Sequence, residues 1–243
     1  MKILADIHVH TISSGHAYST VDEIARFAGS KGMEAVAITD HSAAMPGGAH
    51  LFHFANLHIL PEYIHGVRII RGAEVNIMDY DGTIDLEEAM MEKLDLVIAS
   101  LHPPCIKGAD KETITRTLMK VIENPHVDII GHPGDDRFPM DFDIIAQHAK
   151  KHRVLLELNN SSLQPTGTRL GARKHIVKML ESCKKYETPI VVGSDSHYYG
   201  SVGDFTEAIN LMKELDFPED LIVNKSQDRL MDFIQRKGDS DES

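Results

Sequence analysis

The chain has 243 residues, of which 42% are hydrophobic, so it is long and apolar enough to bury one large core. Its formal net charge of −12 argues against strong nucleic-acid binding, because surfaces that gather nucleic acid need clustered Lys and Arg. No apolar run reaches the length of a signal-peptide core or a membrane span, which predicts a cytoplasmic protein with no membrane partner. Cys105 and Cys183 lack the paired spacing of a thiolate metal site, and we interpret both as free thiols.

Apolar runs rich in β-branched residues recur along the chain, and each closes on a polar residue. Successive closing residues lie 27 to 36 residues apart, which is the length of one strand followed by a helical crossover. The seven closing residues are His10, His41, Glu74, His102, His132, Asn159 and Asp195. Near-continuous apolar strands joined by helices predict a parallel sheet covered on both faces, and seven such units favour a barrel over an open sheet.

The segments between these runs carry helix signals. Thr20 and Glu23 form a capping box ahead of residues 24–32, where Gly32 can end the helix. Residues 140–152 repeat their apolar side chains at helical spacing. Both patterns support a strand-helix alternation.

The last part of the chain departs from this alternation. Residues 203–215 and 226–238 both predict helices, and only the short apolar run 221–223 lies between them, so a regular eighth strand is not expected. We therefore predict one α/β domain over residues 1–238, an incomplete seven-stranded barrel, followed by a short, disordered acidic tail at 239–243.

The first strand contains the segment DIHVHT. Side chains alternate along a strand, so Asp6, His8 and His10 are expected on one face and Ile7 and Val9 on the other. On that face Asp6 either orients a ligand imidazole or is a buried structural carboxylate bonded to backbone, and the sequence leaves both readings open.

Nine potential metal ligands cluster where barrel enzymes form their active sites, at the carboxyl ends of the strands and in the loops that follow. Seven imidazoles and two carboxylates buried together without metal would have few partners. Nine ligands are more than one zinc ion needs, and they match two or three metals that share a carboxylate. A ligand set of imidazoles without thiolates suits zinc, manganese or iron. The nine are His8, His10, His16, His41, Glu74, His102, His132, Asp195 and His197.

These segments resemble the PHP family, named for polymerase and histidinol phosphatase, and in particular its small stand-alone, YcdX-type phosphatase branch. The resemblance extends from about Lys2 to Gly238 and is carried by DIHVHT, HAYST, ITDH, RGAEVNI, HPG and GSDSH. It implies a distorted (β/α)7 TIM-like barrel with a trinuclear centre, usually described as zinc. Carried onto this chain, it implies His8, His10, Glu74 and Asp195 for the first metal, His16, His41 and His197 for the second, and His102 and His132, with Glu74 as a bridge, for the third.

The leading hypothesis is hydrolysis of a phosphate monoester. Three divalent cations and two carboxylates would leave a site of about +4, which suits a small phosphorylated substrate, and the nucleophile would be a metal-activated hydroxide rather than a side chain. Arg169 could bind the phosphate, or could be a solvated loop residue. His50 and His53, in the long segment after His41, are candidates for substrate contact. His53 is also one candidate for the general acid, which the sequence does not identify; a plain helix with surface histidines is the alternative.

Three other functions are considered as alternative hypotheses. A phosphodiesterase or exonuclease acting on nucleotides would use the same metals, but the sequence shows no basic track for a long strand. An amidohydrolase-type enzyme often carries a modified lysine at the end of the fourth strand, where this chain has Ser100, Leu101 and His102. A non-catalytic metal-bound module would hold metal without turnover. A homo-oligomer is compatible with each reading.

Overall fold

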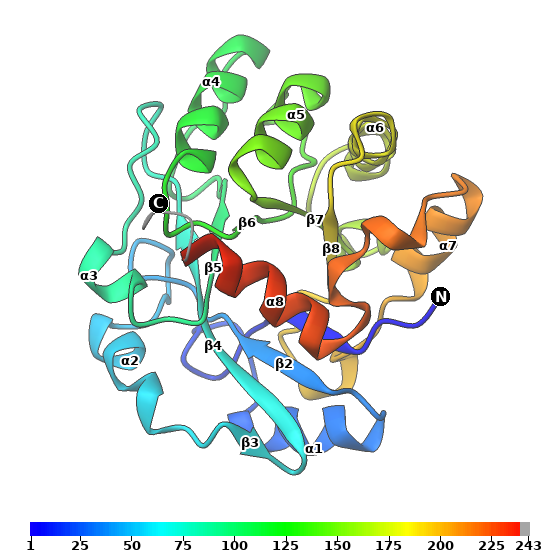
Figure 1. Cartoon of the computed structure of the whole chain (residues 1–243). Coiled ribbons are helices and arrows are strands. Elements are labelled where there is room, and N and C mark those ends of the chain that lie inside the picture. The colour runs from blue at the N-terminus through cyan, green and yellow to red at the C-terminus, as the bar shows by residue number, and fades with distance from the viewer. Residues whose placement is uncertain (239–243) are drawn as a thin grey trace.

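Seven parallel strands form the centre of the fold in the computed structural model (Figure 1). The structure describes residues 1–238, with side chains as far as Ile234, and the predicted acidic tail at 239–243 lies outside the described residues. The strands pair in the order β1-β2-β4-β5-β6-β7-β8, and the short β3 pairs antiparallel with β4. Their bounds are β1 Ala5–Val9, β2 Ala35–Ile38, β3 Tyr63–Ile64, β4 Val67–Asn76, β5 Leu96–Ser100, β6 Ile129–Ile130, β7 Leu155–Asn159 and β8 Ile190–Gly193.

Helices connect the strands and surround them (Figure 1). Their bounds are α1 Val21–Ser30, α2 Leu51–Asn56, α3 Glu88–Met91, α4 Lys111–Ile122, α5 Phe142–His152, α6 Ala172–Tyr186, α7 Thr206–Glu214 and α8 Gln227–Gly238. The predicted capping box of Thr20 and Glu23 starts α1, and Gly32 follows its end with a φ of 70°. Across residues 1–238, none of the helices combines the length and apolarity needed to cross a membrane.

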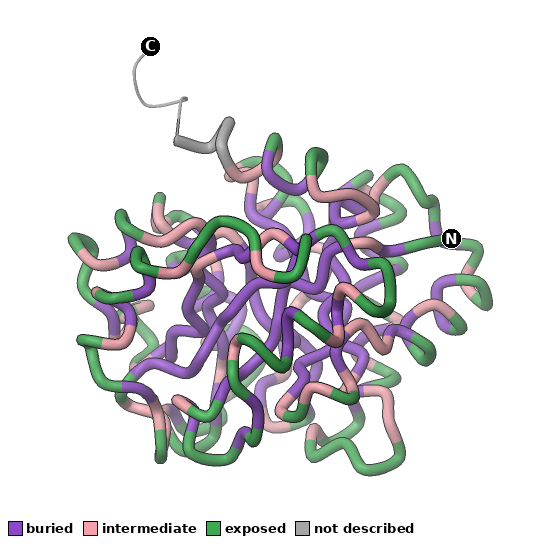
Figure 2. The backbone as a smooth tube through the Cα atoms, turned by 90° about the horizontal axis from the view of Figure 1, so that it is seen from below, coloured by how far each residue is buried: buried purple, intermediate pink, exposed green. Residues whose placement is uncertain are grey.

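The strands separate two apolar layers. The inner layer fills the barrel with side chains from every parallel strand, among them Ile7, Ile70 and Ile98, and the outer layer packs the strands against the surrounding helices. Leu230 and Met231 of α8 belong to the inner layer, so α8 closes the end of the barrel at which the strands begin. Figure 2 shows the buried residues concentrated in the middle of the molecule and the exposed residues on the segments around them. The opposite end of the barrel is left for polar side chains.

A β-bulge interrupts the expected alternation in β1. The pairing of β1 with β2 shifts by one residue between Asp6 and Val9. As a result Ile7 belongs to the inner apolar layer while Val9 belongs to the outer one. The prediction that Ile7 and Val9 share a face is therefore wrong, because the extra residue of the bulge reverses the alternation partway along the strand.

The bulge also explains the position of Asp6, which lies between the inward-facing Ala5 and Ile7 and therefore does not share a face with His8 and His10, contrary to the prediction. Its carboxylate accepts hydrogen bonds from the backbone N–H groups of Ser194, at 3.0 Å, and Gly203, at 2.8 Å. Of the two roles that the sequence left open for Asp6, the structure shows the structural one, a buried carboxylate bonded to backbone. Asp6 holds the chain after β8 against β1.

At the end where the strands begin, β1 and β8 are joined through a side chain, whereas just after β8 the backbone of Ser196 pairs directly with Val9. Within the described residues, the run at 221–223 does not form an eighth parallel strand beyond β8, and Ile222 makes only an isolated bridge to Ile190. Next to it, the fully buried Asn224 amide donates to Ala5 O at 2.8 Å and Val192 O at 2.7 Å, and its Oδ1 accepts from Val192 N at 3.0 Å. Asn224 therefore supplies the hydrogen bonds that a missing strand would have made.

We predict that Asn224→Ala lowers the free energy of unfolding by about 3 kcal/mol, because it leaves buried backbone groups on β1 and β8 without partners. Urea denaturation followed by circular dichroism measures this change. Asn210→Ala, on the exposed surface of α7, is the matched control and should unfold with the wild type. Equal denaturation midpoints for Asn224→Ala and wild type would contradict the role given to Asn224.

Candidate metal centre

Glu74, near the end of β4, lies at the centre of a histidine cluster at the open end of the barrel. Its side chain is completely buried. Its oxygens lie 2.8 Å from His132 Nε2, 3.2 Å from His102 Nε2, 2.7 Å from His41 Nδ1, 3.3 Å from His8 Nε2 and 3.6 Å from His10 Nε2. Five imidazoles that are far apart in the sequence therefore converge on one carboxylate.

The other predicted ligands adjoin this group. Asp195 Oδ1 lies 3.4 Å from His10 Nε2. The His10 ring centre lies 4.3 Å from those of both His41 and His197, and the His16 ring centre lies 4.7 Å from that of His197. The structure thus brings all nine residues singled out by the sequence into one contiguous cluster.

Two residues of the cluster have unusual backbone conformations. His132 has a φ of 31° and Asp195 a φ of 55°, in the left-handed region that residues other than glycine seldom adopt. Such conformations cost about 1–3 kcal/mol each and persist only where surrounding contacts impose them. At both positions the backbone turns sharply just after a strand, which directs the side chain into the cluster.

The loop that carries His16 is held against the loop that follows β2. Gly15 N donates to Gly47 O at 2.7 Å, and a Cβ on Gly15 would lie 3.1 Å from the Cα of Gly47, so the two loops touch through bare backbone. Asp40 is fully buried and accepts from Ser14 Oγ at 2.7 Å. These contacts fix the loop that presents His16 to the cluster.

The carboxylates are held in the ionised state. Burial alone would raise the pKa of Glu74, but the imidazoles of His41, His8 and His102 hold that pKa well below its usual range. The pKa of Asp195 is likewise lowered despite burial, with His8 as the largest favourable cause. Both side chains are therefore available as anionic ligands at neutral pH.

Most of the shifted imidazoles are held neutral. Burial lowers the pKa of His10 to about 3, with a further contribution from His41, and lowers the pKa of His132 to about 4, with a further contribution from Arg169. At His8 burial is outweighed by the facing carboxylates, which raise the pKa well above its usual value. A cation bound there would replace the proton that His8 otherwise attracts.

Several buried atoms of the cluster have no hydrogen-bond partner in the described part of the chain. They are His8 Nε2, His10 Nε2, His41 Nδ1 and Glu74 Oε2. His41 Nδ1 and Glu74 Oε2 lie 2.7 Å apart, yet they are not aligned as a hydrogen bond. Unpaired buried nitrogens and oxygens are costly, and these atoms are the donors that divalent transition metals bind. The cluster is therefore well suited to hold metal.

A second layer of polar side chains orients the histidines. Glu157 of β7 is fully buried; its Oε1 lies 2.8 Å from His8 Nδ1, and its Oε2 accepts from His132 N at 2.7 Å. Asn76 Oδ1 likewise contacts the Nδ1 atom of a cluster histidine, His102, at 2.7 Å. Neither residue was among those predicted from the sequence, although a lone glutamate in the apolar run of β7 is a signal that its side chain faces a polar centre.

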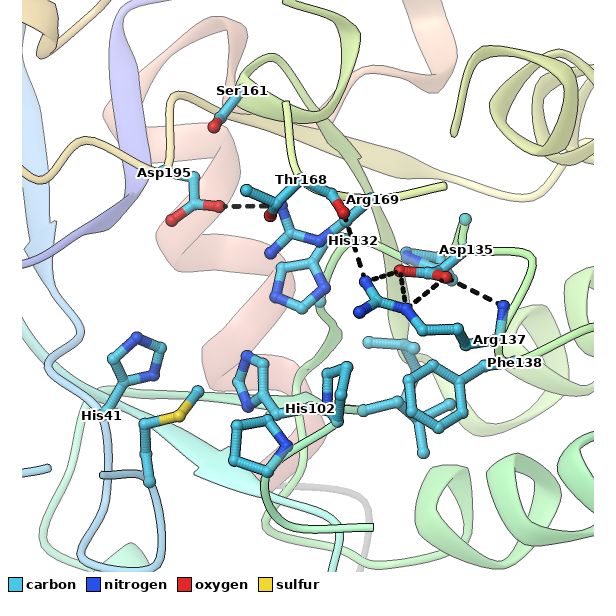
Figure 3. Close-up of a pocket in the computed structure, with 18 of the residues that line it drawn as sticks. His41, His102, His132, Asp135, Arg137, Phe138, Ser161, Thr168, Arg169 and Asp195 are labelled. Atoms are coloured by element: carbon cyan, nitrogen blue, oxygen red, sulfur yellow. Dashed lines mark hydrogen bonds and ion pairs between the residues drawn. The ribbon is translucent and has the colours of Figure 1, made fainter. Parts of the chain in front are cut away.

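A cavity of about 560 Å³ opens above the cluster (Figure 3). Six of the nine residues line it, and the other three, His8, His10 and Glu74, are completely buried. Arg169 also lines the cavity, where its Nη1 lies 3.2 Å from Asp195 Oδ2. A small molecule in this cavity can therefore reach both the cluster and an arginine.

The other predicted substrate contacts lie outside the residues that line this cavity. His50 caps α2, with its Nδ1 accepting from Phe52 N at 3.2 Å. His53 Nε2 lies 3.2 Å from Asp40 Oδ2 and so faces a structural carboxylate. Substrate contact by either histidine, and proton donation by His53, stay predictions. Cys105 and Cys183 are both free thiols, as predicted.

The fold and the cluster together define a barrel with a site able to bind metal at the carboxyl ends of its parallel strands. The PHP domain family model matches residues 6–162, and the chain belongs to this family. The predicted family and the predicted distorted seven-stranded barrel are both confirmed.

Relatives of similar length carry matching names. A protein of Acetivibrio thermocellus named "Probable phosphatase" is 44% identical over 237 residues, covering 98% of this chain and 97% of its own. A protein of Clostridium botulinum with the same name is 40% identical over 238 residues, covering 98% and 97%. The similarity therefore spans nearly the whole of both chains.

Two solved structures share the fold. A histidinol phosphate phosphatase from Lactococcus lactis, complexed with zinc, L-histidinol and phosphate, superimposes with a TM-score of 0.58 at 16% identity, covering 90% of this chain and 95% of its own. A chain of an archaeal ribonuclease P bound to mature tRNA gives a TM-score of 0.60 at 14% identity, covering 96% and 90%. At these identities the likeness shows the fold alone.

We predict that Glu157→Gln weakens metal binding by about 10- to 100-fold, because the neutral amide holds the His8 ring less well than the carboxylate does. Competition with a chromophoric chelator measures the affinity. Glu181→Gln, on the exposed face of α6, is the matched control and should bind metal as the wild type does. Unchanged affinity in a folded Glu157→Gln protein would show that this carboxylate does not orient the ligand.

Proposed function

We propose that this chain is a metal-dependent phosphatase that hydrolyses small phosphate monoesters at a trinuclear centre. Two lines support the proposal. The chain belongs to the PHP family, and relatives 40–44% identical over nearly their whole length are named as probable phosphatases. Its site gathers seven imidazoles and two ionised carboxylates, a donor set that suits zinc first and manganese or iron as alternatives.

The unpartnered atoms around Glu74 are the observation that carries this proposal. Among the residues that the structure describes, His8 Nε2, His10 Nε2 and His41 Nδ1 find no hydrogen-bond partner, and all three are buried and face the same carboxylate. We assign His8, His10, Glu74 and Asp195 to one metal, His16, His41 and His197 to a second, and His102 and His132, with Glu74 shared, to a third. Each group contains side chains from different strands or loops, so the folded barrel is needed to form it.

The protein would contribute positioning and charge. Bound divalent cations would supply Lewis acidity, which lowers the pKa of water and offsets negative charge on the phosphoryl oxygens. Arg169, at the wall of the cavity and 3.2 Å from Asp195, would bind a phosphoryl oxygen and orient the group over the cluster. Glu157 and Asn76 would keep His8 and His102 aimed at the metals.

Hydrolysis of p-nitrophenyl phosphate, measured beside bis-p-nitrophenyl phosphate, tests the function. We expect protein reloaded with zinc or manganese to hydrolyse the monoester faster than the diester, and His10→Ala to fall to the background rate because it removes a ligand at the centre of the cluster.

Each other outcome has a clear meaning. Preference for the diester would replace the proposal with a phosphodiesterase or exonuclease. No turnover of either ester by fully metallated protein would favour a non-catalytic metal-bound module.

The third metal is tested by stoichiometry. We expect the double variant His102→Ala/His132→Ala to bind two metals per chain instead of three, measured by inductively coupled plasma mass spectrometry, because Glu74 alone cannot hold the third cation. Thermal unfolding of the same sample checks that the variant is folded. An unchanged metal content in that sample would contradict the third site.

A further inference from the structure

The cavity has two chemically different halves. One half is formed by the histidines and by Asp195, and the other by apolar side chains of the loops that follow β2, β5 and β6. The main apolar contributors are Leu101, Pro103, Pro104, Phe138 and Met140. A phosphate group needs only the polar half, so the apolar half is available to the rest of a substrate (Figure 3).

The apolar half is formed in advance of any ligand. Gly108, after β5, packs so closely on the backbone of Arg137, after β6, that there is no room for a side chain. Asp136 N donates to Leu170 O at 2.8 Å, which ties the loop after β6 to the loop after β7. Phe138 is only 3% exposed within this arrangement. The wall is therefore a fixed surface rather than a mobile loop.

The charged groups beside this wall are already paired. Arg137 Nε lies 2.9 Å from Asp135 Oδ1, and Arg137 Nη2 contacts Asp135 Oδ2 and lies 3.3 Å from Thr168 O. Figure 3 shows Asp135 and Arg137 facing each other next to Phe138. A substrate rich in hydroxyl groups would lose hydrogen bonds to water here and regain few.

We infer that the substrates are phosphate monoesters of alcohols with a flat, largely apolar body, such as an aromatic ring, which packs against the exposed Pro103 and Pro104 and the small accessible part of Phe138 while the phosphate lies over the histidine cluster. This inference rests on the proposed phosphatase function and specifies its substrate class. Sugar phosphates and short alkyl phosphates fit the polar half equally well but leave the apolar wall uncovered.

The test compares benzyl phosphate with ethyl phosphate and glucose 6-phosphate. All three release a primary alcohol, so differences in turnover report recognition more than leaving-group chemistry. We expect kcat/KM for benzyl phosphate to exceed that for ethyl phosphate by about tenfold or more, as one well-packed aromatic contact allows. Phe138→Ala should reduce that ratio several-fold, whereas Phe52→Ala, an exposed phenylalanine outside the cavity, should not change it.

A binding measurement with wild-type protein covers two complications. Phe138→Ala removes a buried ring and can fail to fold, and the metal-loaded protein can prove inactive on every ester. Calorimetric titration of metal-loaded wild type with benzylphosphonate and ethylphosphonate needs neither the variant nor turnover. Tighter binding of benzylphosphonate by about tenfold shows that the apolar wall recognises an aromatic body; if no ester is hydrolysed, the wall then selects a ligand and the statement about substrates falls with the phosphatase. Equal binding of the two phosphonates, or faster hydrolysis of ethyl phosphate or glucose 6-phosphate, would overturn the inference and leave the phosphatase proposal standing.

Discussion

The burial of Glu74 among five imidazoles is the constraint on which the rest of the site depends. A carboxylate removed from water is stable as an anion only where positive charge or hydrogen bonds compensate for the lost solvent. Here the compensating groups come from β1, from the loop after β2 and from the segments after β5 and β6. The barrel is the framework that can bring those segments to one point.

The division of the barrel interior follows from this constraint. Apolar side chains such as Ile70 of β4 and Leu155 of β7 fill the end where the strands begin, and α8 covers that end. Further along the same strands the inward positions become Glu74 and Glu157, so polarity changes along the barrel axis. The apolar end contributes stability, and the polar end is left to bind charged ligands.

Much of this arrangement could be predicted from the sequence because local rules govern it. Each strand ends in polar residues, and parallel strands of a barrel all end at the same face, so His41, His102 and His132 could be placed together. The capping box at Thr20 depends on residues three apart and could likewise be predicted.

Other features depend on contacts between distant segments. The bulge in β1 arises from its pairing with β2, and nothing within DIHVHT marks the position where alternation fails. Glu157 contacts His8 across 149 residues, and the apolar wall of the cavity forms only where the loops after β5 and β6 meet. These details shape the orientation of the histidines and the form of the cavity, so the sequence could predict which residues gather in the cluster but not the surface that surrounds it.

The most direct test of the account is an anomalous difference map from crystals of the zinc-loaded protein, collected at the zinc absorption edge. We expect three peaks around Glu74, each about 2.0–2.3 Å from its assigned nitrogen and oxygen ligands. A map without peaks in this cluster, with Glu74 hydrogen-bonded to protonated histidines instead, would contradict the central claim that the cluster is a metal centre.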